Sequence, residues 1–136
     1  MKVLVIGSGA REHALAWRLR QSPGLTGLWI AGGNGGTAQI AGNLDVAPED
    51  LDGIVEAARS LSIDLVVVGP ELPLAKGLVD RLDSLGIPAF GPTRAAAQIE
   101  SSKSFALDVM REAGVPRPEF RTFREQQQAL SFLEKH

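Results

Sequence analysis

Two glycine-rich segments stand out in this sequence because their residue types and spacing could bind an anion. Gly7, Ser8 and Gly9 separate an apolar run at 2–6 from a stretch of helical character. A second loop at 32–37, Gly-Gly-Asn-Gly-Gly-Thr, follows the apolar run 28–31. Glycine lets the backbone approach a ligand closely, and the free N–H groups of a helix start favour negative charge. The pair predicts a site for one small phosphorylated ligand, with Gly7, Ser8 and Gly9 at its phosphate. The alternative for either loop alone is a tight turn without a ligand.

A nicotinamide or flavin dinucleotide is the first anion to test, and the sequence departs from its binding pattern twice. The third glycine of G-x-G-x-x-G is replaced by Glu12, which puts a bulky charge where helix and strand should pack closely. The acid expected roughly 20 residues further on is also missing, because the run 28–31 ends in the second glycine loop. We therefore do not expect a dinucleotide-binding oxidoreductase domain.

Charged side chains follow the first loop directly. Arg11 and His13 lie in the first turn of the expected helix, where the helix dipole disfavours a cation unless an anion compensates. We expect Arg11 and Glu12 to contact the ligand, the alternative being a solvated turn in which Glu12 is the favourable partner of the dipole. His13 is more typical of a packed or hydrogen-bonded histidine, and we assign no catalytic residue.

Further candidates come from the second loop and from a later strand end. Asn34, Gly35 and Gly36 would close over the sugar or its phosphate, unless they form only a flexible turn. Glu71 follows the apolar run 64–69, at the edge of the sheet where open α/β folds bind ligands. Its carboxylate could accept hydrogen bonds from ribose hydroxyls or a substrate amine, or could simply be a helix-start acid that the dipole stabilises.

Composition excludes several classes of protein. The 136 residues are 44% hydrophobic with a formal net charge of -2, enough for a core of ordinary domain size. No basic run favours nucleic acid or anionic lipid, so we expect neither a nucleic-acid nor a membrane partner. The absence of cysteine excludes a disulfide scaffold and thiolate metal sites, and we expect no metal site. With a core strand directly at the N-terminus, a cytoplasmic location is the default expectation.

Strand and helix signals alternate, which predicts a doubly wound α/β fold with a mostly parallel sheet of about five strands and a C-terminal helical connector. The expected strands are 2–6, 28–31, 64–69 and 88–90, and Asp45 and Val46 could form another. The expected helices are 10–21, 48–61, 70–86, a short one after Thr93, one from Ser101, and a polar one at 124–136, with 120–123 as a further candidate strand. Trp17 and Trp29 are interpreted as core residues.

Four stretches resemble phosphoribosylamine–glycine ligases, also called glycinamide ribonucleotide synthetases, in order and spacing along nearly the whole chain. They are 7–15, 33–38, 67–74 with Gly77 and Asp80, and 90–106 with its Glu-Ser-Ser-Lys-Ser-Phe-Ala ending. Gly32 and Ala10 depart from the family, which usually has proline and glycine at these positions. The resemblance implies a Rossmann-like substrate-binding domain at 1–90, and at 91–136 a connector with the truncated start of an ATP-grasp domain.

The resemblance also implies the chemistry of a parent enzyme several times longer than this chain. ATP phosphorylates the carboxylate of glycine, the amine of 5-phosphoribosylamine attacks the acyl phosphate, and ADP and phosphate leave, as a step of purine biosynthesis. Lys103 would contact ATP phosphate, unless it is merely an exposed lysine. ATP and magnesium would serve the full-length enzyme, and we expect neither to bind tightly here.

Because most of the ATP-grasp domain lies outside this sequence, we expect the isolated chain to be inactive. Its expected partners are 5-phosphoribosylamine and the remaining ATP-grasp domains of the parent enzyme. The alternative is a stand-alone phosphosugar-binding or protein-interaction module whose role is separate from ligation.

Overall fold

The computed structural model describes residues 1–135. The chain forms two compact units, one ending at Ser101 and the other beginning at Ser102. The sequence predicts a different division, with a substrate-binding domain at 1–90 and a connector at 91–136. That division also assigns a function to each part, and it stays a prediction.

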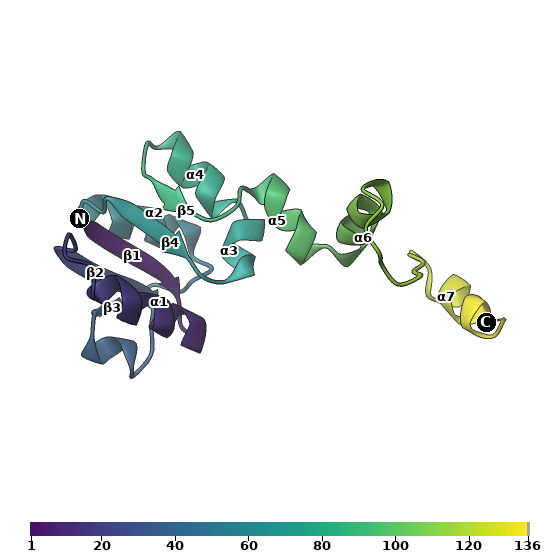
Figure 1. The fold of residues 1–136 in the computed structure, drawn as a ribbon, viewed down its shortest axis with the longest axis horizontal. Coiled ribbons are helices and arrows are strands. Elements are labelled where there is room, and N and C mark those ends of the chain that lie inside the picture. The colour runs from purple at the N-terminus through teal and green to yellow at the C-terminus, as the bar shows by residue number, and fades with distance from the viewer. Residues whose placement is uncertain (136) are drawn as a thin grey trace. The chain divides into compact units, whose positions relative to one another are not determined.

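The first unit is built on a five-stranded parallel sheet with the strand order β3-β2-β1-β4-β5 (Figure 1). The strands are β1 (Lys2–Gly7), β2 (Gly27–Gly32), β3 (Gly42–Leu44), β4 (Leu65–Val68) and β5 (Ala89–Phe90). In the register of the sheet, Val5 of β1 lies between Ile30 of β2 and Val67 of β4. The predicted doubly wound α/β class is confirmed, and the strand order reverses between β1 and β4.

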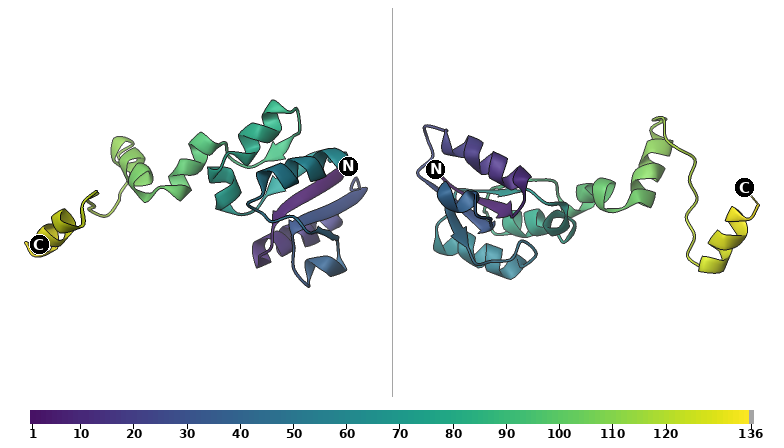
Figure 2. Two further views of the ribbon diagram at one scale, coloured as in Figure 1. Left: turned by 180° about the vertical axis from the view of Figure 1, so that it is seen from behind. Right: turned by 90° about the horizontal axis from the view of Figure 1, so that it is seen from below.

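Helices cover both faces of this sheet, and successive residues of β1 point into different cores (Figures 1 and 2). Val3 and Val5 pack with Ala16 of α1 (Ala10–Arg20) on one face. Leu4 and Ile6 pack on the other face with residues of α2 (Leu51–Ser60) and α4 (Leu78–Ser84). Because both faces are covered, β1 is apolar at every position from Val3 to Ile6, and β4 is apolar throughout, as expected for a parallel sheet.

The single helix expected over 70–86 is wrong, because the chain forms α3 (Glu71–Ala75) and α4 with a break between them. Gly77 adopts φ +89 at this break, a left-handed conformation that only glycine accepts readily. After the break the Asp80 carboxylate accepts a hydrogen bond from the backbone N–H of Arg94 at 2.7 Å. That bond joins α4 to the start of α5 (Arg94–Ser101).

Helix α2 begins at Leu51 and not at Pro48 as the sequence predicts, because Asp50 is its N-cap. The Asp50 side chain accepts a hydrogen bond from the backbone N–H of Gly53 at 3.0 Å, which satisfies one of the unpaired donors of the first turn.

Replacing Asp50 with alanine is expected to lower the free energy of unfolding by about 1 kcal/mol, because the first turn of α2 loses its capping acceptor. Urea denaturation followed by circular dichroism measures this loss. Asp50→Asn is the matched control, since an amide oxygen retains the acceptor. An Asn variant as unstable as the Ala variant would contradict the capping role.

Two smaller predictions also need correction. The short strand expected at Asp45 and Val46 lies at Gly42–Leu44. Trp17 is 57% exposed and is therefore not a core residue, because α1 directs its neighbour Ala16 at the sheet. Trp29 does pack against the core, as predicted.

The second unit contains α6 (Lys103–Glu112) and α7 (Gln126–Leu133). The Ser102 hydroxyl caps α6 by accepting from the backbone N–H of Phe105 at 3.4 Å. Residues 120–123 do not form the candidate strand. The rings of Phe123 and Phe132 instead lie 5.4 Å apart. In the described part of the chain no helix combines the length and apolar character needed to cross a membrane.

Candidate functional site

A crevice lies at the carboxyl ends of β1 and β4, where the strand order reverses. Its volume is about 290 Å³, and it is lined by Gly9, Ala10, Arg11, Glu12, Pro70 and Glu71. Open α/β sheets bind ligands at this kind of position, because the loops that follow neighbouring strands diverge there. The crevice therefore brings together Gly9 of the first glycine loop, the charged residues Arg11 and Glu12 and the later Glu71. Their role in ligand binding stays a prediction.

Glu12 lies inside the first loop and is only 5% exposed. Its carboxylate accepts a hydrogen bond from the backbone N–H of Gly9 at 2.8 Å. A Cβ atom at Gly7 or at Gly69 would overlap the Glu12 side chain. In dinucleotide folds a third loop glycine lets the helix approach the strand closely. Here Gly69 makes the room instead, by leaving space for the Glu12 side chain. Nothing in the sequence indicated this role for Gly69.

Because the Glu12 carboxylate occupies the N–H of Gly9, that donor is engaged within the protein. The next N–H groups of α1, those of Ala10 and Arg11, have no preceding helical turn to bond and lie at the positive end of the helix dipole. Arg11 is exposed, and its guanidinium donates to the carbonyl of Gly69 at 2.7 Å. Arg11 therefore links the start of α1 to the end of β4.

The side chain of Asn34 bonds the backbone of the first glycine loop and so connects the two loops. Its side-chain Nδ2 donates to the carbonyl of Ser8 at 2.9 Å, and its Oδ1 accepts from the backbone N–H groups of Gly36 at 2.8 Å and Thr37 at 3.0 Å. The N–H of Gly33 adds a backbone bond to the carbonyl of Gly7 at 3.0 Å. The two predicted loops therefore form one structure, and the role of Asn34, Gly35 and Gly36 in ligand binding stays a prediction.

Gly32 stands where the ligases that the sequence resembles usually have proline. Gly32 adopts φ +91, whereas proline is restricted to a φ near −65°. A proline could not adopt this conformation, so the second loop has a geometry that depends on its own glycine.

Thr37 and Asn43 support the second loop and were not predicted. Thr37 is fully buried, and its hydroxyl lies 2.9 Å from the side-chain oxygen of Asn43. The spacing Asn34-x-x-Thr37 is the one signal that could have indicated them, because asparagine and threonine often bond nearby backbone groups in turns.

His13 is half-buried, and a Cβ at Gly36 would overlap its imidazole. This position is that of the packed histidine expected from the sequence. Glu71 is exposed in the first turn of α3 and lines the crevice, so both interpretations of its carboxylate stay open at this point.

Comparison with known proteins gives the chain a family. Residues 1–100 match the family model described as phosphoribosylglycinamide synthetase, N domain. The chain belongs to this family. The phosphoribosylamine–glycine ligase of Allochromatium vinosum is 49% identical over 135 residues, which are 98% of this chain and 32% of that protein. The ligase of the same name from Nostoc sp. is 49% identical over 136 residues. The chain, whose residues 1–100 form this N domain, thus spans about a third of the length of these relatives.

Solved structures show the same fold. The phosphoribosylamine–glycine ligase of Thermotoga maritima superposes with a TM-score of 0.74 at 24% identity, over 99% of this chain and 30% of that one. The N5-carboxyaminoimidazole ribonucleotide synthetase of the same organism gives 0.73 at 16% identity, over 96% of this chain and 36% of that one. The topology of the N domain is therefore shared with proteins whose sequences differ widely from this one.

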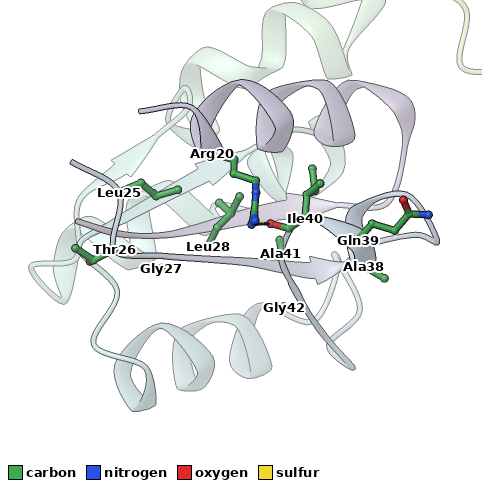
Figure 3. A pocket seen from close by; sticks show the side chains of 10 residues that line it. All are labelled: Arg20, Leu25, Thr26, Gly27, Leu28, Ala38, Gln39, Ile40, Ala41 and Gly42. Carbon is green, nitrogen blue, oxygen red and sulfur yellow. Dashed lines mark hydrogen bonds between the residues drawn. The ribbon is translucent and has the colours of Figure 1, made fainter. Parts of the chain in front are cut away.

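A larger concavity of the N domain, about 560 Å³, lies away from the crevice, between the start of β2 and the segment Ala38 to Gly42 (Figure 3). Figure 3 shows Arg20 reaching from α1 to the carbonyl of Ile40, which it bonds at 2.5 Å. The one charged side chain of this lining is therefore already engaged, and the other side chains shown are apolar or uncharged. Although this concavity is larger than the crevice, it does not lie at the carboxyl ends of β1 and β4.

Lys103, the predicted ATP contact, is the exposed first residue of α6 in the second unit. Within residues 1–135, no group of three or more His, Asp or Glu side chains is arranged to hold a metal ion.

Proposed function

We propose that this N domain binds 5-phosphoribosylamine for a ligase that joins glycine to this amine with hydrolysis of ATP. The observation that carries the proposal is the crevice between the ends of β1 and β4, which is lined by the first residues of α1, with their unpaired N–H groups, and by Glu71. The names of the relatives, phosphoribosylamine–glycine ligase, support the choice of substrate. Purine biosynthesis is the process to which this reaction would contribute.

The groups that line the crevice suit different parts of the substrate. The phosphate suits the N–H groups of Ala10 and Arg11, since backbone donors at a helix start stabilise an anion without a side-chain charge. Gly7, Ser8 and Gly9 form the turn that presents these donors. Glu71 suits the ribose hydroxyls or the amine, which donate to a carboxylate.

Ligation also requires groups that this chain does not supply. ATP, glycine and the amine must be held together in a reactive geometry, and such positioning accounts for much of the rate of an enzyme. The domains that complete this arrangement belong to the other two thirds of the relatives' length. Lys103 would contribute one contact to ATP phosphate, and magnesium would neutralise the nucleotide. Incubation of the isolated chain with ATP, glycine and phosphoribosylamine should therefore release no ADP, and turnover would contradict this division of labour.

Calorimetric titration with ribose 5-phosphate, a stable stand-in for the substrate, tests the binding role. We expect ribose 5-phosphate to bind and Glu71→Gln to weaken it about tenfold, because a hydrogen bond to a charged acceptor is worth roughly 1.5–3 kcal/mol. Glu49→Gln, an exposed glutamate outside the crevice lining, is the matched control and should bind as the parent chain does. Equal binding of ribose and ribose 5-phosphate, or tight binding of a nicotinamide dinucleotide, would contradict the proposal.

A further inference from the structure

We infer that Asn34, Thr37 and Asn43 form a positioning network that holds the second glycine loop against the first, and that Asn34 acts through this network rather than by touching the sugar. The inference rests on the proposed function, since the loops are expected to hold ribose 5-phosphate. It assigns a role in ligand binding to Thr37, a residue that no ligand can reach.

The side chain of Asn34 has little capacity left for a ligand. Its Oδ1 already accepts two hydrogen bonds, from the N–H groups of Gly36 and Thr37, and an amide oxygen has two lone pairs. Its Nδ2 faces the carbonyls of Ser8 at 2.9 Å and Gly9 at 3.4 Å. Both ends of the amide therefore bond protein groups, and the side chain connects loops that are 26 residues apart in the sequence.

Thr37 holds the backbone of Asn34 in place. It is 0% exposed, and its hydroxyl accepts from the backbone N–H of Asn34 at 2.7 Å. The hydroxyl proton faces two acceptors at 2.9 Å, the carbonyl of Asn34 and the side-chain oxygen of Asn43. Removal of this buried hydroxyl is expected to destabilise the loop, because its partners would lose a hydrogen bond that water cannot replace.

Asn43 ties this arrangement to the sheet. It lies in β3, where it pairs with Ile30 of β2, and its Nδ2 donates to the carbonyl of Asn34 at 3.0 Å. Gly33 permits the approach, since a Cβ there would overlap the Asn43 side chain. The network therefore runs from a strand of the sheet, through Thr37 and Asn34, to the carbonyls of the phosphate-binding turn.

The test measures ribose 5-phosphate affinity by calorimetry at a temperature where each variant is folded by circular dichroism. Thr37→Val preserves the shape of the side chain and removes the hydroxyl, and it should weaken binding about 5- to 10-fold. Thr37→Ser restores the hydroxyl and should bind within about twofold of the parent chain. Asn34→Ala should weaken binding at least as much as Thr37→Val, and the double variant no more than Asn34→Ala alone, because both changes break one network.

The outcomes separate this inference from the proposed function. If Thr37→Val binds normally while Asn34→Ala does not, Asn34 touches the ligand and the inference is overturned. If the parent chain itself does not bind ribose 5-phosphate, the proposed function fails, and the network is judged by amide hydrogen exchange without ligand. Thr37→Val should then speed exchange of the Gly33 and Gly36 N–H groups about tenfold, although neither bonds Thr37. Unchanged exchange at both would refute the network.

Discussion

Replacing Gly69 with alanine is expected to lower the free energy of unfolding by about 1–3 kcal/mol, the usual cost of forcing extra atoms into a packed site. The backbone is not the cause, because Gly69 does not have a positive φ. The three atoms nearest to an added Cβ all belong to the buried side chain of Glu12. The new methyl group must therefore displace the carboxylate that caps the first loop.

A double-mutant cycle isolates this contact. In a Glu12→Ala background, Gly69→Ala should cost less than about 0.5 kcal/mol, since the overlapping atoms are gone. Gly7→Ala is the matched control: its Cβ would also overlap Glu12, but Gly7 has φ +129, so removal of Glu12 should not rescue it. Urea denaturation followed by circular dichroism measures all four corners of each cycle. An equal cost of Gly69→Ala in both backgrounds would show that Glu12 is not the obstacle.

Replacing Leu82 with alanine is expected to lower the free energy of unfolding by about 2–5 kcal/mol, because it removes buried methyl groups and leaves a cavity. Leu82 is 0% exposed and packs in the larger of the two cores, between α4 and the sheet. The free energy of unfolding of a small domain is only about 5–15 kcal/mol, so this one change removes a large part of it.

Leu85, immediately after α4 and 39% exposed, is the matched control for the same chemical change. Leu85→Ala should cost less than about 1 kcal/mol, because partly exposed methyl groups lose little contact with water on folding. Both variants are compared by urea denaturation. Similar losses of unfolding free energy for the two variants would contradict the burial of Leu82 against the sheet.

The sequence predicted the elements of the sheet wherever the local pattern was strong. The apolar runs of β1, β2 and β4 and the glycine loop before α1 were sufficient, since these signals depend on neighbouring residues alone. The weak cases failed for identifiable reasons. Strand β3 has only three residues, two of them exposed. Leu74, Leu78 and Leu82 keep helical spacing across the break at Gly77, so periodicity alone cannot reveal it.

The candidate site was predicted less completely than the fold. Of the residues that line the crevice, Gly9, Arg11, Glu12 and Glu71 were named as site residues from the sequence, because glycines and charges at strand ends are visible there, whereas Ala10 and Pro70 were not. Thr37 and Asn43 were missed, and nothing in the residues indicated that Gly69 makes room for Glu12. The contacts of the site with a ligand stay predictions.

By itself, the sequence determined that this chain forms a parallel α/β sheet with two glycine loops at its edge, because backbone freedom and apolar periodicity act over a few residues. Only the tertiary structure decided which groups meet there: the Glu12 carboxylate beside Gly69, and the Asn34 amide on the Ser8 carbonyl. Those pairings follow from the strand order, which places β1 between β2 and β4. Distant loops become neighbours only after the strands have paired, so no local pattern encodes their hydrogen bonds.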